Sequence, residues 1–450
     1  MLFVESLVLV GISLNEWLVL LEARHPRTID LGLERSCEVW GRMGSPRPAR
    51  QIFTVAGTNG KGSTVAYLCG MLKGLGYSFG SYTTPHLFRY NERVRVNGIA
   101  ASDRLLLDAF ERVEAARGDV SLSYFEFGTL AAISLMHDYR NAAGNEVGLD
   151  FAVMEVGLGG RLDAVNILDA NCAVITTVGL DHQEYLGDDR ESIGREKAGI
   201  IRRNVPLICG EKDPPASVLA EASRLQAPLL RLGHEFSAVD ERESIRFTRG
   251  ATDILLPRPQ MIGRHQVDNM ATALAALLEL APHALNNADQ LVGGLALVSL
   301  AGRLQRVSDH PPVYVDVGHN AQAAEAIREA LSKMMGQGEI SSCHCVLAML
   351  ADKDATAVAQ ILEPVVSAWY CAGLGGERGQ SGEQLANKIR AGEIDAKVTS
   401  CVDVGTALDA ALSALSTERP GADCVLVFGS FLSAGQAIGR WHADQSADRT

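Results

Sequence analysis

Short apolar runs rich in β-branched residues alternate along this chain with longer stretches that are apolar at helical spacing. The short runs predict buried parallel strands, and the longer stretches predict helices. Regular alternation of the two predicts an α/β fold, in which a mostly parallel sheet carries helices on both faces. In the first half of the chain the expected strands are Gln51–Val55, Tyr77–Tyr82, Asp150–Glu155, Cys172–Val178, Val205–Cys209 and Pro228–Leu232.

Two segments of this half depart from the alternation. Residues 14–42 are expected to be largely helical with a turn at residues 25–27, and Gly32 weakens the helical pattern over Thr28–Arg35. Residues 234–256 predict a β-hairpin or small meander that decorates the sheet. The remaining expected helices cover 63–72, 102–117, 123–139, 191–202, a stretch ending at Arg224, 265–281 and 288–297.

The alternation stops at residues 301–312, which contain Gly302 and two prolines, and then starts again. This break predicts an N-terminal domain over residues 1–300, a linker or hinge over 301–312, and a smaller Rossmann-like α/β domain over 313–450. The expected strands of the second domain are Val313–Val317, Cys343–Met349, Ala368–Cys371, Ala396–Thr399 and Cys424–Phe428. Its expected helices cover 321–335, 355–362, 381–389, 404–415 and 434–440.

Composition narrows the class of protein. The 450 residues, 47% of them hydrophobic and 21% charged, fit a globular protein of two or three domains. The formal net charge of −13 argues against a general nucleic-acid binder, although a local basic pocket can still bind anions. No apolar run is long enough to span a membrane, and we interpret Met1–Val10 as an N-terminal extension because it lacks the features of a signal peptide.

Nine cysteines are scattered without the spacing of a disulfide framework, and their number is odd. Reduced thiols in the cytoplasm are the simplest interpretation. In Cys343-His344-Cys345, strand alternation would place the two thiols on one side and the imidazole on the other. That arrangement favours core packing over metal binding.

The residues between the first expected strand and its helix form a glycine-rich turn, Gly57-Thr-Asn-Gly-Lys-Gly-Ser63. Backbone N–H groups and the helix N-terminus can approach a polyphosphate in such a turn, and Lys61 adds a positive charge for the outer phosphates. The turn is of P-loop type but shorter than usual, and Gly62 stands where Ser or Thr normally binds the metal. A turn without a ligand is the alternative. If the turn does bind phosphate, another residue must supply the missing hydroxyl.

Polar residues follow three further strand ends. Thr84 follows the second strand, Glu155 closes the third, and Asp181-His182 follows the fourth. These ends share the sheet edge at which open α/β sheets bind ligands, so a carboxylate there can hold Mg²⁺ and Thr84 can supply the hydroxyl. The alternatives are an ordinary turn residue at position 84, an ion-paired acid at 155 and a structural histidine at 182.

Sequence blocks in the same order as in a known family run along almost the whole chain. They are Thr28–Arg35, Gly57–Ser63, Tyr82–Leu87, Tyr124–Glu126, Glu155–Ala164, Asp181-His182, Arg190–Gly199, Gly302-Arg303, Asp316–Asn320 and Val427–Phe431. On these blocks the chain closely resembles the bacterial bifunctional dihydrofolate synthase/folylpolyglutamate synthases, which belong to the Mur ligase superfamily.

This resemblance implies a cytoplasmic, monomeric, ATP-dependent amide ligase. In that family ATP phosphorylates a carboxylate, the amine of L-glutamate attacks the acyl phosphate, and phosphate leaves as the amide forms. The implied acceptors are dihydropteroate, which gives dihydrofolate, and reduced folates, which give folylpolyglutamates. In such a reaction the main contributions of the protein are to position the reactants and to neutralise phosphate charge.

The resemblance also implies roles for individual residues. Lys61, His182 and Lys197 are implied as catalytic residues, with Lys197 carbamylated by CO₂. Two Mg²⁺ sites are implied, with Thr84, Glu155, His182 and carbamylated Lys197 as ligands. The implied ATP-binding residues are Gly57, Thr58, Asn59, Gly60, Lys61, Gly62, Ser63, Asn269, Arg303 and Asp316. The implied pterin or folate region comprises Ser123, Tyr124, Phe125, Glu126, Leu162, Asp163 and Ala164, and the Thr28–Arg35 block is expected to border it.

The chain departs from the family pattern in a few places. Thr84 stands where Ser is common, and Leu432 stands where a His often follows Gly-Ser-Phe. Val317, Gly318 and Ala321 replace the usual Gly, Ala and Pro. None of these changes removes a residue with an implied catalytic role, so they concern substrate details rather than the reaction class.

Three other interpretations remain at this point. The first is an enzyme that only extends glutamate chains. The second is a Mur-type cell-wall ligase, which the Thr28–Arg35 block and the pterin-region motifs disfavour. The third is a nucleotide-binding regulator without catalysis, which would be expected to have lost some of Lys61, Glu155, His182 and Lys197, whereas all four are present.

Overall fold

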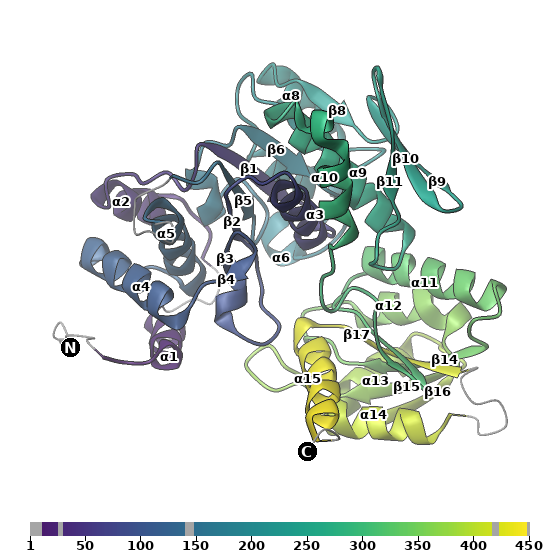
Figure 1. Cartoon of the computed structure of the whole chain (residues 1–450). Helices are drawn as coiled ribbons and strands as arrows, with labels where there is room; N and C mark the ends of the chain where they lie inside the picture. The colour runs from purple at the N-terminus through teal and green to yellow at the C-terminus, as the bar shows by residue number, and fades with distance from the viewer. Residues whose placement is uncertain (1–10, 26–29, 140–147, 416–422, 448–450) are drawn as a thin grey trace.

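Two large sheets, each covered by helices, and a small third sheet make up the described part of the molecule (Figure 1). The computed structural model describes residues 11–25, 30–139, 148–415 and 423–447. In Figure 1 the purple-to-teal part of the chain builds the first sheet, and the light green to yellow part builds the second. The expectations for residues 1–10, for the turn at 26–27 and for Thr28 and Ile29 lie outside the described residues.

The first sheet has eight strands in the order β4-β3-β2-β5-β1-β6-β7-β8. They are β1 (Gln51–Ala56), β2 (Phe79–Tyr82), β3 (Val94–Val96), β4 (Ile99–Ala100), β5 (Phe151–Glu155), β6 (Cys172–Ile175), β7 (Leu207–Cys209) and β8 (Leu229–Arg231). From β2 to β8 neighbouring strands run parallel, which confirms the predicted mostly parallel sheet. The antiparallel edge strands β3 and β4 escape prediction because they are too short to show a period.

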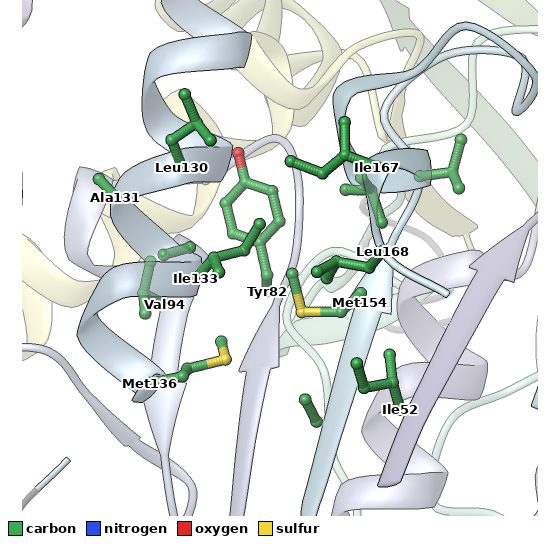
Figure 2. Packing of buried hydrophobic residues seen from close by; sticks show 14 of the residues in the cluster. Ile52, Tyr82, Val94, Leu130, Ala131, Ile133, Met136, Met154, Ile167 and Leu168 are labelled. Atoms are coloured by element: carbon green, nitrogen blue, oxygen red, sulfur yellow. The ribbon is translucent and has the colours of Figure 1, made fainter. Parts of the chain in front are cut away.

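Alternate residues of the strands pack into two cores, one on each face of this sheet. In β1, Ile52 and Ala56 join one core, whereas Phe53 and Val55 join the other. The first core is covered by α1 (Leu14–Arg24), α2 (Glu34–Arg42), α4 (Asp103–Arg117), α5 (Tyr124–His137), α7 (Arg190–Ala198) and α8 (Ala216–Arg224). The second is covered by α3 (Lys61–Gly74), α9 (Arg264–Leu280) and α10 (Ala288–Ala296). Figure 2 shows part of the first core, where Tyr82 lies beside Leu130 and Ile133 of α5, and Ile52 and Met154 belong to the same cluster.

The predicted meander is present as a separate three-stranded antiparallel sheet. Its strands are β9 (Phe236–Glu241), β10 (Ser244–Arg249) and β11 (Thr252–Pro257). Phe236 and Phe247 anchor it in the second core, beside α9.

The second sheet has six strands in the order β12-β13-β17-β14-β15-β16. The strands are β12 (Gln305–Asp309), β13 (Pro312–Val315), β14 (Ser342–Leu347), β15 (Ala368–Ala372), β16 (Lys397–Cys401) and β17 (Asp423–Phe428). Helices α11 (Ala321–Gly336), α12 (Ala355–Leu362) and α13 (Gly382–Ala391) cover one face, and α14 (Val404–Ser413) and α15 (Phe431–Ala447) cover the other. The predicted smaller α/β domain at the C-terminal end is therefore confirmed.

The segment expected to be a linker, residues 301–312, is partly β-strand. Gln305–Asp309 forms β12, which pairs antiparallel with β13. The sequence conceals this strand because its side chains are only half-buried or exposed, so it shows no apolar run. Of the two prolines that suggested a break, Pro311 lies at the turn between β12 and β13, and Pro312 is the first residue of β13. The chain thus joins the second sheet earlier than expected, and the exact domain limits and the hinge stay predictions.

The structure also bears on the cysteines and on membrane insertion. All nine cysteines are free thiols. Cys343 and Cys345 lie in the core, while His344 stacks on Tyr370 with the ring centroids 5.9 Å apart, which confirms core packing for this segment. Among the described residues, no helix combines the length and the apolar character needed to cross a membrane.

Candidate active site

A cleft of about 330 Å³ lies between the two halves of the molecule, at the carboxyl ends of β1, β2, β5 and β6. Every residue expected to be catalytic, to bind ATP or to bind metal lines it. From the first half these are Gly57–Ser63, Thr84, Glu155, His182, Lys197 and Asn269. From the second half they are Arg303 and Asp316. The strand-end argument therefore places its residues together, although the role of each one stays a prediction.

The glycine-rich turn connects β1 to α3 and brings Lys61 into the cleft. Gly60 precedes the helix with φ of +83°, and a Cβ at this position would lie 2.4 Å from Asn269 Oδ1. Only glycine fits this close approach of the turn to α9. The Lys61 ammonium donates to the carbonyl oxygens of Gly57 at 2.8 Å and Thr58 at 3.1 Å, so its charge lies over the turn. Burial lowers the pKa of Lys61, and the nearby Glu155 carboxylate opposes this shift.

Glu155 is a buried carboxylate at the end of β5. Its Oε2 accepts one hydrogen bond, from the backbone N–H of Thr84 at 3.3 Å. Burial raises the pKa of Glu155, and Lys61 is the main group that counteracts the rise. A buried carboxylate with so little compensation favours a cation beside it. Together with the Thr84 hydroxyl it offers the oxygen ligands that Mg²⁺ prefers.

The protein alone does not provide a complete metal cage. Within the described residues, no three His, Cys, Asp or Glu side chains are grouped so that they could hold a metal ion. A magnesium ion in this cleft would therefore need ligands from a hydroxyl or from the nucleotide itself. Partial coordination of this kind is usual for Mg²⁺ bound together with phosphates.

His182 follows β6 in the left-handed conformation, with φ of +51°, and begins α6 (Gln183–Leu186). Burial lowers the pKa of His182 to about 4, so its imidazole is neutral, which is the form that binds metals. Its Nε2 lies 3.5 Å from the Lys353 ammonium.

Asp181, the neighbour of His182, is tied to the second half of the molecule. Its carboxylate accepts from Lys353 Nζ at 2.6 Å and from Asn320 Nδ2 at 3.0 Å, and it lies 3.3 Å from His319 Nε2. Sequence reasoning missed Lys353 and gave His319 no role. His319 lies inside the Asp316–Asn320 block, whereas Lys353 meets Asp181 across 172 positions and carries no local signal.

Lys197 is a buried lysine on α7. Burial, and after it the nearby Lys61 charge, lowers the pKa of Lys197 to about 7. A substantial fraction of the side chain is then a neutral amine near neutral pH, and only the neutral amine can attack an electrophile such as CO₂.

Arg303 and Asp316 shape the second half of the cleft. The guanidinium of Arg303 lies 5.4 Å from the centroid of the Phe431 ring. The Asp316 carboxylate accepts from the backbone N–H of Leu304 and of Gly318, both at 2.7 Å. Asp316 therefore fixes the loop that carries Arg303, and any contact of its own with ATP stays a prediction.

None of the seven residues expected to bind the pterin or folate lines the cleft. Ser123 and Glu126 form the capping box of α5, and Glu126 also pairs with Arg35 at 3.1 Å. Asp163 accepts from the backbone N–H of Leu158 at 2.9 Å and of Val165 at 3.0 Å, and burial raises its pKa to about 7. These three polar side chains hold the surrounding backbone in place, and a contact of any of them with the substrate stays a prediction.

Among the other members of this set, Phe125 contacts the lining of the cleft. The Phe125 ring packs against Gly157, where an added Cβ would lie 2.6 Å from the ring, and Gly157 lines the cleft. Tyr124 meets Tyr90 edge to face with ring centroids 5.9 Å apart. The Phe125 ring is thus the aromatic group of this set that touches the cleft lining, while roles of Tyr124, Leu162 and Ala164 in substrate binding stay predictions.

Comparison with protein families defines the class of this protein. Residues 55–277 match the model of the Mur ligase middle domain, and residues 302–431 match that of the Mur ligase, glutamate ligase domain. The two matches correspond to the two halves that meet at the cleft. The fold and the cleft are therefore those of a Mur-type ligase.

Individual relatives specify the family further. The chain is 42% identical over 428 residues to the dihydrofolate synthase/folylpolyglutamate synthase of Escherichia coli K12, covering 93% of each chain. It is 37% identical to the enzyme of the same name from Haemophilus influenzae, covering 93% of this chain and 95% of the relative. The chain belongs to the dihydrofolate synthase/folylpolyglutamate synthase family.

Solved structures agree with this assignment. The structure of E. coli FolC in complex with DHPP and ADP superimposes with a TM-score of 0.87 at 40% identity, covering 97% of this chain and 99% of that one. A folylpolyglutamate synthase/dihydrofolate synthase from Yersinia pestis, complexed with AMPPNP and a Mn ion, gives a TM-score of 0.85 at 39% identity, covering 96% and 98%.

Proposed function

We propose that this protein is an ATP-dependent ligase that adds L-glutamate to dihydropteroate and to reduced folates, and that the reaction takes place in the cytoplasm. The observation that carries the proposal is one cleft that joins Lys61, Glu155, His182 and Lys197 to the C-terminal half. The relatives named for both synthase activities support it, because they match over nearly the whole chain.

The chain's residues suit phosphoryl transfer followed by amide formation. The γ-phosphoryl group of ATP would pass to the acceptor carboxylate, giving ADP and an acyl phosphate. The glutamate amine would then attack the acyl carbon and lose a proton, and phosphate would leave. The turn at Gly57–Ser63 and the Lys61 ammonium would hold the transferring group, whose charge must be neutralised throughout.

The divalent ion in this proposal is Mg²⁺. The buried Glu155 carboxylate and the Thr84 hydroxyl would hold it, with the neutral imidazole of His182 nearby. When bound, the ion would withdraw negative charge from the phosphate oxygens. The Yersinia pestis structure with AMPPNP and Mn supports a divalent ion together with the nucleotide.

Lys197 would be carbamylated in the active enzyme. Its lowered pKa, about 7, makes the amine available to CO₂, and the product would turn a buried cation into an anion. An anion at this position could take part in a second metal site, which an ammonium group would disfavour. The two-metal arrangement rests on this modification.

An acceptor-dependence assay tests the proposed function. Purified protein with Mg²⁺ and ATP should release ADP only when L-glutamate and a pteroate acceptor are both present. Dihydropteroate and a reduced folate are supplied in separate reactions, so that the two activities are measured independently. ADP release that does not depend on L-glutamate, or does not depend on the acceptor, would contradict the proposal. Activity with the reduced folate but not with dihydropteroate would restrict the function to chain extension.

A further inference from the structure

Arg93 is a buried arginine that no role described so far uses. It ends the short 3-10 helix Tyr90–Arg93 and lies directly before β3, with 8% of its surface exposed. Its carbonyl oxygen accepts from the backbone N–H of Thr83 at 2.8 Å. The residue is thereby fixed opposite the turn that carries Thr84 into the cleft.

The guanidinium group of Arg93 holds both ends of the turn Thr84-Pro85-His86. Its Nη1 donates to Thr84 Oγ1 at 3.1 Å, and its Nε donates to His86 Nδ1 at 2.9 Å. Because arginine has no acceptor, Nδ1 of His86 must be unprotonated. The fork therefore fixes the hydroxyl at one end and the imidazole tautomer at the other.

Two aromatic rings hold the guanidinium itself in place. The Arg93 Cζ atom lies 5.3 Å from the ring centroid of Tyr90 and 5.4 Å from that of Tyr124. These distances suit cation–π contacts, which are strongest where water is excluded. Arg93 therefore links the aromatic wall near the expected pterin region to the hydroxyl at the phosphate end of the cleft.

The charge of Arg93 is compensated in an unusual way. Among the residues that the structure describes, no carboxylate lies within ion-pair distance of its guanidinium, although buried charges are normally paired. Its direct contacts are a hydroxyl, an imidazole and two rings, and it also interacts with Tyr82 and, at longer range, with the Glu155 carboxylate. Because the groups in direct contact with the Arg93 guanidinium are neutral, we expect Arg93 to orient these groups rather than to neutralise a charge.

We propose that Arg93 is a positioning residue, which acts on the reaction by fixing the rotation of the Thr84 hydroxyl. This inference rests on the proposed function. A hydroxyl oxygen has two lone pairs, and the Arg93 donor occupies one of them. The other is left for a ligand in the cleft, so the donor restricts the direction in which Thr84 can bind.

A double-mutant cycle tests this role. We expect Arg93→Met to lower kcat by about 10–100-fold, the size of effect that a small misplacement causes, while KM for ATP changes less than about threefold. Thr84→Val removes the hydroxyl that Arg93 is proposed to orient. If Arg93 acts through Thr84, the double mutant that combines Arg93→Met with Thr84→Val should have a kcat less than about threefold below that of Thr84→Val alone.

Further variants separate positioning from folding. Arg93→Lys keeps the charge and one donor but cannot reproduce the fork, so we expect it to recover only part of the lost kcat. Arg95→Met, two residues further on in β3, is the matched control with unchanged kcat, because Arg95 donates to the carbonyl of Gly98 at 3.3 Å and, in the described structure, forms no hydrogen bond with Thr84 or His86. Circular dichroism establishes the folded fraction of each variant.

Two results would overturn the proposal. One is a folded Arg93→Met enzyme with wild-type kcat, and the other is a multiplicative loss in the double mutant. If Thr84→Val is too slow to assay, the same cycle is measured on Mn²⁺ affinity by electron paramagnetic resonance. Losses of binding free energy that simply add in the double mutant would refute the proposal equally. A wild-type enzyme without acceptor-dependent ADP release would instead refute the proposed function and leave the contacts of Arg93 unexplained.

Discussion

At the scale of single residues, burial gives the cleft its chemistry. Glu155, His182 and Lys197 are ordinary titratable groups whose pKa values shift chiefly because they are removed from water. Burial disfavours the charged form of each group, so it raises the pKa of the acid and lowers the pKa values of the imidazole and the amine. The sequence identifies these residues, but burial, and with it the size of each shift, comes only from the fold.

Lys61 provides the first test at this scale. We expect Lys61→Ala to lower kcat by at least about 10²–10³-fold, because a buried positive charge at the phosphate turn would be lost. Lys73→Ala is the matched control, since Lys73 is exposed at the other end of the same helix. Steady-state ADP release measures both variants. Wild-type kcat in folded Lys61→Ala would contradict the phosphate role.

Lys197 provides the second test. We expect a carbamate carbonyl signal in ¹³C NMR when the protein is equilibrated with ¹³CO₂, and its absence in Lys197→Met. The amine has a pKa of about 7, so the neutral fraction grows as the pH rises through 7, and labelling should be weaker at pH 6 than at pH 8. Identical spectra from the wild type and Lys197→Met would rule out carbamylation at this residue.

At the scale of secondary-structure elements, the sequence predicts long buried elements well and short edge elements poorly. Strands β1, β5 and β6 show clear apolar runs because both of their faces are buried. Strands β3, β4 and β12 depend on pairing partners rather than on their own pattern. The helix expected over 123–139 is present as α5, and its capping box shows how the Ser123 and Glu126 side chains start it, while their role at a ligand stays a prediction.

The turn before α3 can be tested by one glycine substitution. Gly60→Ala would bring a Cβ to 2.4 Å from Asn269 Oδ1, so we expect a loss of stability of about 1–3 kcal/mol and a lower kcat/KM for ATP. Gly76→Ala is the control, because Gly76 has a similar φ of +78° and nothing within 4 Å of the added Cβ. Thermal unfolding and ADP release are measured for both. Equal effects of the two variants would show that the contact with Asn269 does not matter.

At the scale of the whole molecule, the two halves meet through Asp181. Its contacts with Lys353, Asn320 and His319 span the cleft and connect the end of β6 to the second sheet. Asp181, His319 and Asn320 lie in blocks that the sequence singles out, but no pattern in the sequence shows that these residues and Lys353 contact one another across the cleft. The strand-end argument succeeds for the cleft itself because the topology of a parallel sheet brings strand ends together.

The Lys353 contact tests whether this junction supports nucleotide binding. We expect Lys353→Met to raise KM for ATP by about tenfold, a typical size for coupling between two parts of a protein, because Asp181 loses its closest cationic partner. Lys333→Met, at an exposed position on α11, is the control. An unchanged KM in the folded Lys353 variant would show that this ion pair does not contribute to nucleotide binding.

The central claim is that the cleft transfers a phosphoryl group from ATP to the acceptor's carboxylate before glutamate is joined. Transfer of an isotope tests it most directly, with dihydropteroate labelled by ¹⁸O in both carboxylate oxygens, unlabelled ATP and L-glutamate. Mass spectrometry should find one ¹⁸O atom in each inorganic phosphate released and one in the new amide. Phosphate free of ¹⁸O, at a normal rate of amide formation, would contradict the acyl-phosphate mechanism.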